Sequence, residues 1–233
     1  MDYKNSFSCI ITAAGLGTRF KAPEKKQFIT LKNKPILFHT IELFYNLKEI
    51  KEIIVTLPED DLERLAPQIK NDYPKINKII IGGINRQESV YRALINCNQN
   101  NYVIIQDGVR PFLDHNDLKK MMSLVKKYKA VIPGNKIKNT LKKINLDRIT
   151  DTISRDDIIE VFTPQVFERE LIMKYHELAK DTPHSFTDDA SILEHYNQQV
   201  FWYHMVNLNL KITTKEDYEL ALLYIEKKEK KNG

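Results

Sequence analysis

Short runs of apolar, mostly β-branched residues recur through the first 135 residues, and helical patterns lie between them. The runs begin near Ser8, Glu52, Lys78, Tyr102 and Ala130. The intervening segments place apolar residues at helical spacing, as in PILFHTIELFYN and HNDLKKMMSLVKKYK. Because strands that alternate with helices build parallel sheets with helices on both faces, this order predicts an α/β fold with a doubly wound, mostly parallel sheet.

The pattern changes after residue 135. The segment KIKNTLKKINLDRITDTISR alternates apolar and polar residues on both sides of an Asn-Leu-Asp turn, which predicts a protruding β-hairpin. A lone hairpin needs a partner for its apolar face, so we expect a dimerisation arm at about residues 135–158 of a single domain, 1–233. Farther along we expect a helix near 166–180, a helix opening at Thr187, a strand QVFWYHM and a last helix from Thr214.

Composition excludes several classes of protein. The 233 residues are 42% hydrophobic and 29% charged, an ordinary globular balance. No apolar run approaches the roughly 20 residues that span a bilayer, so we expect no membrane association and a cytoplasmic location. Cys9 and Cys97 form no CxxC motif or Cys/His cluster, which argues against disulfides and structural zinc. The net charge of +5 comes from scattered lysines and the tail IEKKEKKNG, so no nucleic-acid partner is expected.

The loop after the first strand carries the strongest chemical pattern. Glycine is scarce, at seven residues, yet two glycines fall in Ala13-Ala14-Gly15-Leu16-Gly17-Thr18-Arg19, ahead of Lys25-Lys26-Gln27-Phe28. Backbone N–H groups of such a loop can hold phosphates. The loop lacks the third glycine of a dinucleotide fingerprint and the Gly-Lys-Ser/Thr of a P-loop. Arg19 and Lys26 supply instead the positive charge that the attack of one phosphate on another requires.

This loop resembles the N-terminal motif of sugar-phosphate nucleotidyltransferases. From about Ile10 to Leu222 the chain resembles one branch of them, the 2-C-methyl-D-erythritol 4-phosphate cytidylyltransferases of the non-mevalonate isoprenoid pathway. The later motifs are Gly82-Gly83-Ile84-Asn85-Arg86 with Ser89, Asp107-Gly108-Val109-Arg110-Pro111, Asn139-Thr140 with Lys142, Arg155, Thr163-Pro164-Gln165, Thr187-Asp188-Asp189-Ala190-Ser191 and Asn209-Leu210-Lys211-Ile212-Thr213. The resemblance implies a Rossmann-like fold and a reaction in which CTP and 2-C-methyl-D-erythritol 4-phosphate give 4-diphosphocytidyl-2-C-methyl-D-erythritol and pyrophosphate.

The resemblance also assigns site residues. The expected nucleotide-binding residues are Ala13, Ala14, Gly15, Gly17, Gly82, Gly83, Arg86, Ser89, Asp107 and Gly108. The expected catalytic residues are Arg19, Lys26, Arg155 and Lys211. The acceptor phosphate is expected at Arg110, Thr140, Arg155, Thr163 and Lys211. Asp107 is expected to bind Mg²⁺ or another divalent cation, which prefers carboxylate and phosphate oxygens; the alternative is a loop carboxylate that caps the next turn.

Two further expectations concern the arm and the acidic pair. In the family, the residues that match Thr140 and Arg155 reach into the neighbouring subunit's site, so the resemblance implies a homodimer that exchanges arms. Asp188 and Asp189 are interpreted as acids at a helix N-terminus rather than as a second metal site. The six histidines show no metal-ligand spacing and are interpreted as structural.

Several residues depart from the family pattern, and alternatives stay open. Ile84, Gln106, Asn139 and Leu208 stand where the family often has Asp, His, Asp and a polar residue. Ribitol-5-phosphate cytidylyltransferases share the first loop, and Val109-Arg110-Pro111-Phe112 suits them, whereas the run from Thr187 to Ser191 favours the isoprenoid branch. A non-catalytic nucleotide-binding protein would not need the retained cations. A dehydrogenase would need a ribose-binding acid after the second strand, where Thr56-Leu57-Pro58 offers none.

Overall fold

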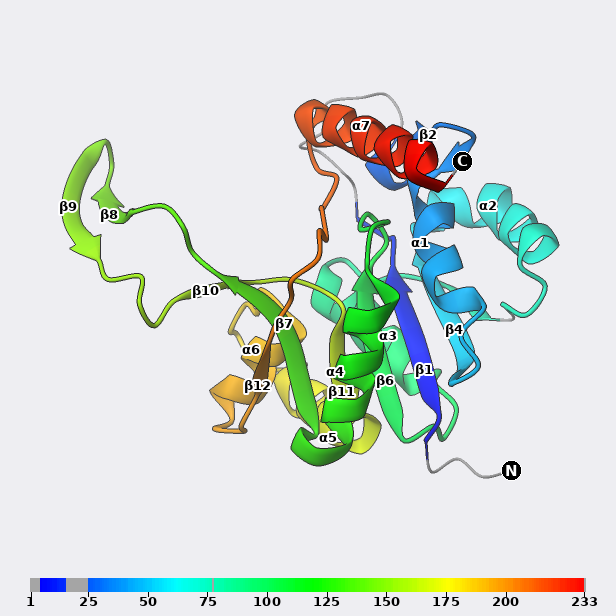
Figure 1. The fold of residues 1–233 in the computed structure, drawn as a ribbon. Helices are drawn as coiled ribbons and strands as arrows, with labels where there is room; N and C mark the ends of the chain where they lie inside the picture. Colours follow the sequence, from blue (N-terminus) through cyan, green and yellow to red (C-terminus); the bar gives the residue numbers. More distant parts are fainter. Residues whose placement is uncertain (1–4, 16–24, 77, 233) are drawn as a thin grey trace.

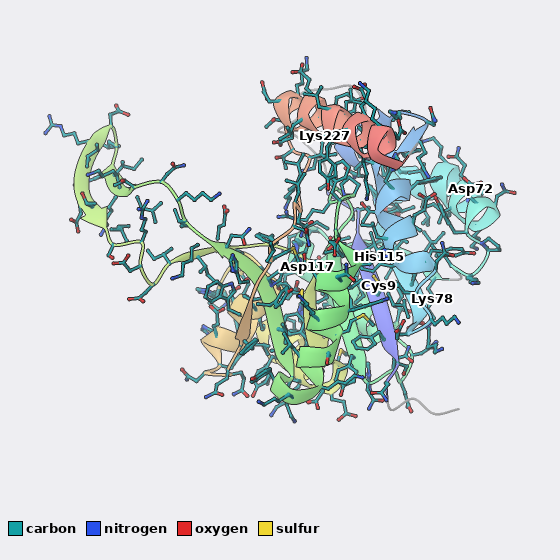
Figure 2. All side chains as sticks on the ribbon, viewed as in Figure 1. Cys9, Asp72, Lys78, His115, Asp117 and Lys227 are labelled. Carbon is teal, nitrogen blue, oxygen red and sulfur yellow. The ribbon has the colours of Figure 1, made fainter. Side chains whose placement is uncertain are left out.

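The chain folds around one central sheet with helices on both faces, and a hairpin projects from one side (Figure 1). The structure is a computed structural model that describes residues 5–15, 25–76 and 78–232. Figure 2 shows Cys9 inside the sheet, whereas Asp72 and Lys227 lie at the surface.

The sheet is mostly parallel. Its strands are β1 (Phe7–Thr12), β4 (Ile50–Leu57), β5 (Lys78–Ile81), β6 (Tyr102–Asp107), β7 (Ala130–Lys136), β10 (Ile159–Val161), β11 (Gln165–Glu168) and β12 (Phe201–His204). They are ordered β10-β7-β11-β6-β1-β4-β5, and β12 pairs with β7. Strand β1 runs parallel to β4 and β6, whereas β10 and β11 run antiparallel to their neighbours. The predicted α/β fold with a mostly parallel sheet is confirmed.

Two apolar layers cover the faces of the sheet. The helices are η2 (Lys26–Phe28), α1 (Ile36–Tyr45), α2 (Glu59–Asp72), α3 (Arg86–Ile95), α4 (His115–Tyr128), α5 (Arg169–Ala179), α6 (Asp189–His195) and α7 (Lys215–Asn232). Cys9 and Ile11 of β1 pack with residues of α1, α2 and α4. Ile10 packs in the opposite layer with residues of α3, α5 and α6. Because both faces are buried, the strands are nearly continuous apolar runs rather than alternating ones.

Local side-chain bonds fix the two helix starts nearest the site. Asn85 caps α3 by accepting the N–H of Glu88 at 2.8 Å. Asp188 caps α6 and forms a capping box with Ser191. The helix predicted to open at Thr187 therefore begins later, at Asp189, because Asp188 is the extended N-cap residue whose carboxylate accepts the N–H of Ser191 at 3.0 Å.

One predicted element was only partly right. The helix expected near 166–180 is α5, Arg169–Ala179, and the residues just before it form β11 instead. Val166 and Phe167 are fully buried there, and β11 pairs with both β6 and β7. Strand pairing in the middle of the sheet therefore overrides the helical continuation of the pattern.

The predicted hairpin is present and stands away from the sheet (Figure 1). It consists of β8 (Leu141–Asn145) and β9 (Arg148–Ile153), which pair with each other in a two-stranded sheet. Ile144 and Ile149 face each other across the ladder, and both are about 65% exposed (66% and 65%). The hairpin thus carries an uncovered apolar surface. A smaller hairpin is formed by β2 (Thr30–Leu31) and β3 (Lys34–Pro35).

Candidate active site

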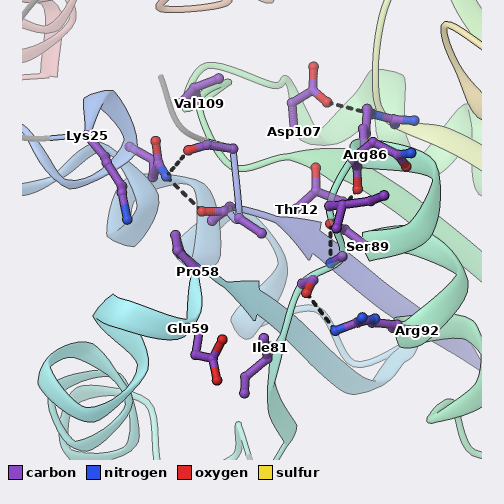
Figure 3. Close-up of a pocket in the computed structure, with 18 of the residues that line it drawn as sticks. Thr12, Lys25, Pro58, Glu59, Ile81, Arg86, Ser89, Arg92, Asp107 and Val109 are labelled. Atoms are coloured by element: carbon purple, nitrogen blue, oxygen red, sulfur yellow. Dashed lines mark hydrogen bonds and ion pairs between the residues drawn. The ribbon is translucent and has the colours of Figure 1, made fainter. Parts of the chain in front are cut away.

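A cleft of about 610 Å³ opens at the carboxyl ends of β1, β4, β5 and β6 (Figure 3). This is where open α/β sheets bind their ligands. Most residues assigned to the nucleotide line it: Ala13, Ala14, Gly15, Gly82, Gly83, Arg86, Ser89 and Asp107. Lys26 and Lys211, assigned to catalysis, line it too. Parts of the chain that are far apart in sequence therefore meet at one site.

Gln27 holds the backbone of the loop that follows β1. Its side-chain Nε2 donates to the carbonyl oxygens of Ala13 and Gly15, each at 2.8 Å. This buried amide fixes the turn at the point where the chain leaves β1. Gly17 and Arg19 lie outside the described residues, so their assigned roles stay predictions.

The glycine pair opposite is required by close packing. A Cβ atom on Gly82 would lie 2.2 Å from the Cβ of Ala14, and one on Gly83 would lie 2.4 Å from the Cβ of Glu88. The hydroxyl of Ser89 accepts the N–H of Gly83 at 2.9 Å and donates to the carbonyl of Asn85 at 2.8 Å. The absence of a side chain at Gly82 therefore lets this loop approach Ala14, which lines the same cleft.

Sequence reasoning missed a clasp that holds this glycine loop, formed by Arg92 and Glu88. Arg92 donates to the carbonyl of Gly82 at 2.8 Å and to Glu88 at 2.7 Å. The second oxygen of Glu88 accepts the N–H of Ile84 at 2.8 Å. Opposite charges four residues apart, directly after the glycine motif, are the signal that was available. The side chain of Ile84, one of the departures from the family pattern, is 94% exposed.

Asp107 is the electrostatic centre of the site. Its Oδ2 lies 2.8 Å from Lys211 Nζ and 3.4 Å from Arg110 Nε, and its Oδ1 lies 3.5 Å from Arg86 Nε. Burial raises the pKa of this carboxyl, but the three cations outweigh burial and hold the pKa well below its usual range. The carboxylate is therefore ionised at neutral pH, and four residues predicted for the site are brought into contact.

Arg110 and Thr163 support Asp107 from behind the cleft. The backbone N–H of Asp107 donates to Thr163 Oγ1 at 3.0 Å, and Arg110 donates to the carbonyl of Asn209 at 2.7 Å. Asn209 in turn donates to the carbonyl of Thr163 at 2.7 Å. Gly108 does not line the cleft; its N–H bonds to the carbonyl of Thr12 at 2.9 Å. These bonds fix the end of β6 beside the segment that carries Lys211.

Asp189 has a larger role than the sequence indicated. Its side chain is fully buried, and its Oδ2 lies 2.8 Å from Nη2 of Arg86. Gln165 accepts the backbone N–H of Asp189 at 3.1 Å, which fixes the start of α6 against β11. The interpretation as helix N-terminal acids holds for the cap, Asp188, but Asp189 is also the buried counter-charge of Arg86.

Thr140 and Arg155 are not brought into the cleft of their own chain. Both are exposed on the arm. Arg155 lines a separate hollow of about 870 Å³ at the base of the arm, with Asn139, Glu160 and Trp202 among its neighbours. Their assignment to the acceptor phosphate stays a prediction.

The chain is similar to members of one protein family over nearly its whole length. The model of the family described as 2-C-methyl-D-erythritol 4-phosphate cytidylyltransferase matches residues 7–227. Relatives carrying that name in Clostridium botulinum and Clostridium tetani are each 37% identical, over 90% and 97% of this chain and 95% and 93% of theirs. The crystal structure of 4-diphosphocytidyl-2C-methyl-D-erythritol synthase from Anaerococcus prevotii is 31% identical, with a TM-score of 0.82 over 95% of this chain and 99% of that one.

The described part of the chain contains no helix with the length and apolar character needed to cross a membrane. The resemblance seen in the sequence motifs agrees with the matched family and with the fold of the solved relative. This chain belongs to the family of 2-C-methyl-D-erythritol 4-phosphate cytidylyltransferases.

Proposed function

We propose that this protein transfers a cytidylyl group from CTP to 2-C-methyl-D-erythritol 4-phosphate and releases pyrophosphate. The observation that carries the proposal is the cluster of cations around the ionised Asp107, in which Lys211 and Arg86 line the nucleotide-sized cleft and Arg110 lies behind it. Such a cluster provides the charges that two polyanionic substrates need in order to meet. Family membership supports the same reaction.

The reaction joins two phosphates. An oxygen of the acceptor phosphate forms a bond to the α-phosphorus of CTP, and the bond between that phosphorus and the bridging oxygen breaks. Pyrophosphate leaves with the electron pair of the broken bond. The attacking phosphate is already ionised, so positioning and charge neutralisation carry the reaction without a general base.

The cations have different tasks. Lys26 and Lys211 face the cleft, where their ammonium groups would stabilise the negative charge that develops on the phosphates. Arg110 is buried against Asp107, and its guanidinium lies 5.4 Å from the ring centre of Phe162. With Thr163 it fixes the wall on which the acceptor phosphate is proposed to bind.

The site fits Mg²⁺. No group of three or more His, Cys, Asp or Glu in the described part of the chain could hold a metal by itself. Among the described residues, three carboxylates line the cleft, Asp107 at the end of β6 and Glu59 and Asp60 at the start of α2, and Asp107 is the one that lies beside Lys211 and Arg86. Mg²⁺ commonly binds through one or two carboxylates together with substrate phosphates. Held by Asp107 and the triphosphate, it would supply charge neutralisation between the phosphates.

We further infer a homodimer that exchanges arms. The hairpin exposes Ile144 and Ile149 to solvent, and a two-stranded ribbon is rarely stable without a partner surface. Thr140 and Arg155 lie on this arm, remote from the cleft of their own chain. Exchange would bring them to the acceptor end of the neighbouring cleft.

Pyrophosphate release in the presence of CTP and Mg²⁺ tests the function. We expect release with 2-C-methyl-D-erythritol 4-phosphate but not with ribitol 5-phosphate, and little release when UTP or ATP replaces CTP. Asp107→Asn, which removes the ionised centre, is expected to abolish it. Release with ribitol 5-phosphate alone would contradict the acceptor, and no release with either acceptor would contradict the activity.

A further inference from the structure

A histidine occupies a core position of α5. The buried face of this helix consists of Ile172, Tyr175, His176 and Ala179, at the spacing of an apolar stripe. The side chain of His176 is 0% exposed. Its Nε2 lies 3.2 Å from Oδ1 of Asp189, and its Nδ1 has no hydrogen-bond partner among the described residues. Within the described chain, the contact with Asp189 is the only hydrogen bond made by this ring.

The direction of that hydrogen bond follows from the partner. Burial raises the pKa of Asp189, but the charge of Arg86 and the hydrogen bond from His176 outweigh burial and hold the pKa below its usual range. An ionised carboxylate only accepts hydrogen bonds, so Nε2 of His176 carries the proton and donates it. The two oxygens of Asp189 are thereby divided, with Oδ1 on His176 and Oδ2 on Arg86.

This division matters because Arg86 stands at the wall of the cleft. Its Nη2 contacts Asp189, while its Nε lies 3.5 Å from Oδ1 of Asp107. If Oδ1 of Asp189 lost its donor, the unpaired buried oxygen would turn toward the other N–H groups of Arg86. A bidentate ion pair between Arg86 and Asp189 would draw the guanidinium away from Asp107 and from the nucleotide.

We propose that His176 is a positioning residue for nucleotide binding, acting through Asp189 to hold the guanidinium of Arg86 in the cleft. The inference rests on the proposed function only in taking Arg86 to face the nucleotide. A residue that merely fills the core would act through its volume. A positioning residue acts through its N–H donor.

Two substitutions of matched size separate these roles. His176→Gln keeps a side-chain N–H at nearly the reach of Nε2, whereas His176→Met has similar length and no donor. Calorimetric titration with CTP and Mg²⁺ should give a Kd about tenfold higher for His176→Met, as expected for losing a hydrogen bond to a buried charge, and about the wild-type Kd for His176→Gln. In turnover, the KM for CTP should rise in the same proportion, while kcat and the KM for the acceptor stay within about twofold.

A double variant tests whether the effect of His176 on CTP binding passes through Arg86. In an Arg86→Ala background, His176→Met should raise the Kd for CTP no further, because the effect passes through the missing guanidinium. Equal Kd values for wild type and His176→Met would overturn the proposal. So would a His176→Gln variant as weak as His176→Met, or an undiminished effect in the Arg86→Ala background.

A readout on the unmodified protein covers the case in which His176→Met does not fold. Nitrogen NMR of the imidazole should show His176 protonated at Nε2, with its signal shifting when CTP is added. An Nδ1-protonated ring, or a signal insensitive to CTP, overturns the proposal.

Because CTP binding is measured apart from turnover, failure of this proposal can be distinguished from failure of the proposed function. A protein that binds CTP with the expected variant pattern but transfers nothing contradicts the proposed function alone.

Discussion

The Nζ of Lys211 lies 2.8 Å from Oδ2 of Asp107, so a segment close to the C-terminal helix meets the end of β6 at the centre of the cleft. We expect Lys211→Met to lower kcat by about a hundredfold, because a charge that stabilises the reacting phosphates is removed. Lys211→Arg, which keeps the charge, should recover part of the loss. Steady-state kinetics measure both, and a Lys211→Met enzyme with normal kcat would exclude this residue from catalysis.

Lys26 and Lys25 form a matched pair of neighbours on the cleft. The ammonium of Lys25 is held 2.5 Å from Asp61 of α2. Lys26→Ala is therefore expected to lower kcat by about a hundredfold or more, and Lys25→Ala by much less. Both variants should unfold near the wild-type temperature in a thermal scan. Equal losses in the two variants would show that total charge at the cleft, rather than the position of Lys26, governs the rate.

Mixing two inactive variants tests whether Arg155 acts across the dimer. Lys26→Ala subunits contribute an intact arm, and Arg155→Ala subunits contribute an intact cleft. Random exchange places one complete site in each mixed dimer, so an equal mixture should reach about a quarter of the wild-type activity. Exchange is verified by mass spectrometry of the mixed dimers. A mixture that stays inactive after verified exchange would place both residues in the site of one subunit.

The apolar side of the arm should control assembly. Ile144 and Ile149 are paired across β8 and β9, and we expect Ile144→Asp with Ile149→Asp to yield monomers in sedimentation equilibrium. Activity should fall with the dimer, while the melting temperature stays within about 3 °C because the core is untouched. Leu223→Asp, at an equally exposed leucine on α7, is the control. Dimers that survive both isoleucine changes would place the interface elsewhere.

The Arg92 clasp should affect nucleotide affinity and little else. Arg92→Met frees the carbonyl of Gly82 and loosens Glu88, so the KM for CTP should rise by about three- to tenfold with kcat nearly unchanged. Lys180→Met breaks an exposed ion pair with Glu177 that does not involve the glycine loop, and it should leave the KM unchanged. An unaltered KM in Arg92→Met would show that the N-terminal cap of α3 holds the loop by itself.

Elements whose pattern is local could be predicted from the sequence. Strands such as Tyr102–Asp107 are bounded apolar runs, and the arm alternates apolar and polar residues around its turn. Strand β11 could not be separated from α5, because Val166 and Phe167 run directly into the helical pattern. Only burial between β6 and β7 distinguishes them.

The site residues also fall into those that the sequence can predict and those that it cannot. Glycine loops and strand-end carboxylates such as Asp107 can be predicted, because the backbone geometry they serve is local. Contacts between residues that are far apart in the sequence cannot be predicted in this way. Nothing near Arg86 in the sequence indicates that Asp189 neutralises it, and nothing near His176 indicates that its ring bonds to that carboxylate.

Lys136 and Ile159 are direct partners in the ladder between β7 and β10, so the arm leaves the sheet and returns to it at one point. Residues 137–158 therefore form a projecting segment whose two ends are held side by side by strand pairing. Its length can change by insertion or deletion without altering the register of a single sheet strand. In an arm-exchanging dimer, the length of the arm would set the distance between the two clefts. That distance can change in evolution while the central sheet keeps its structure.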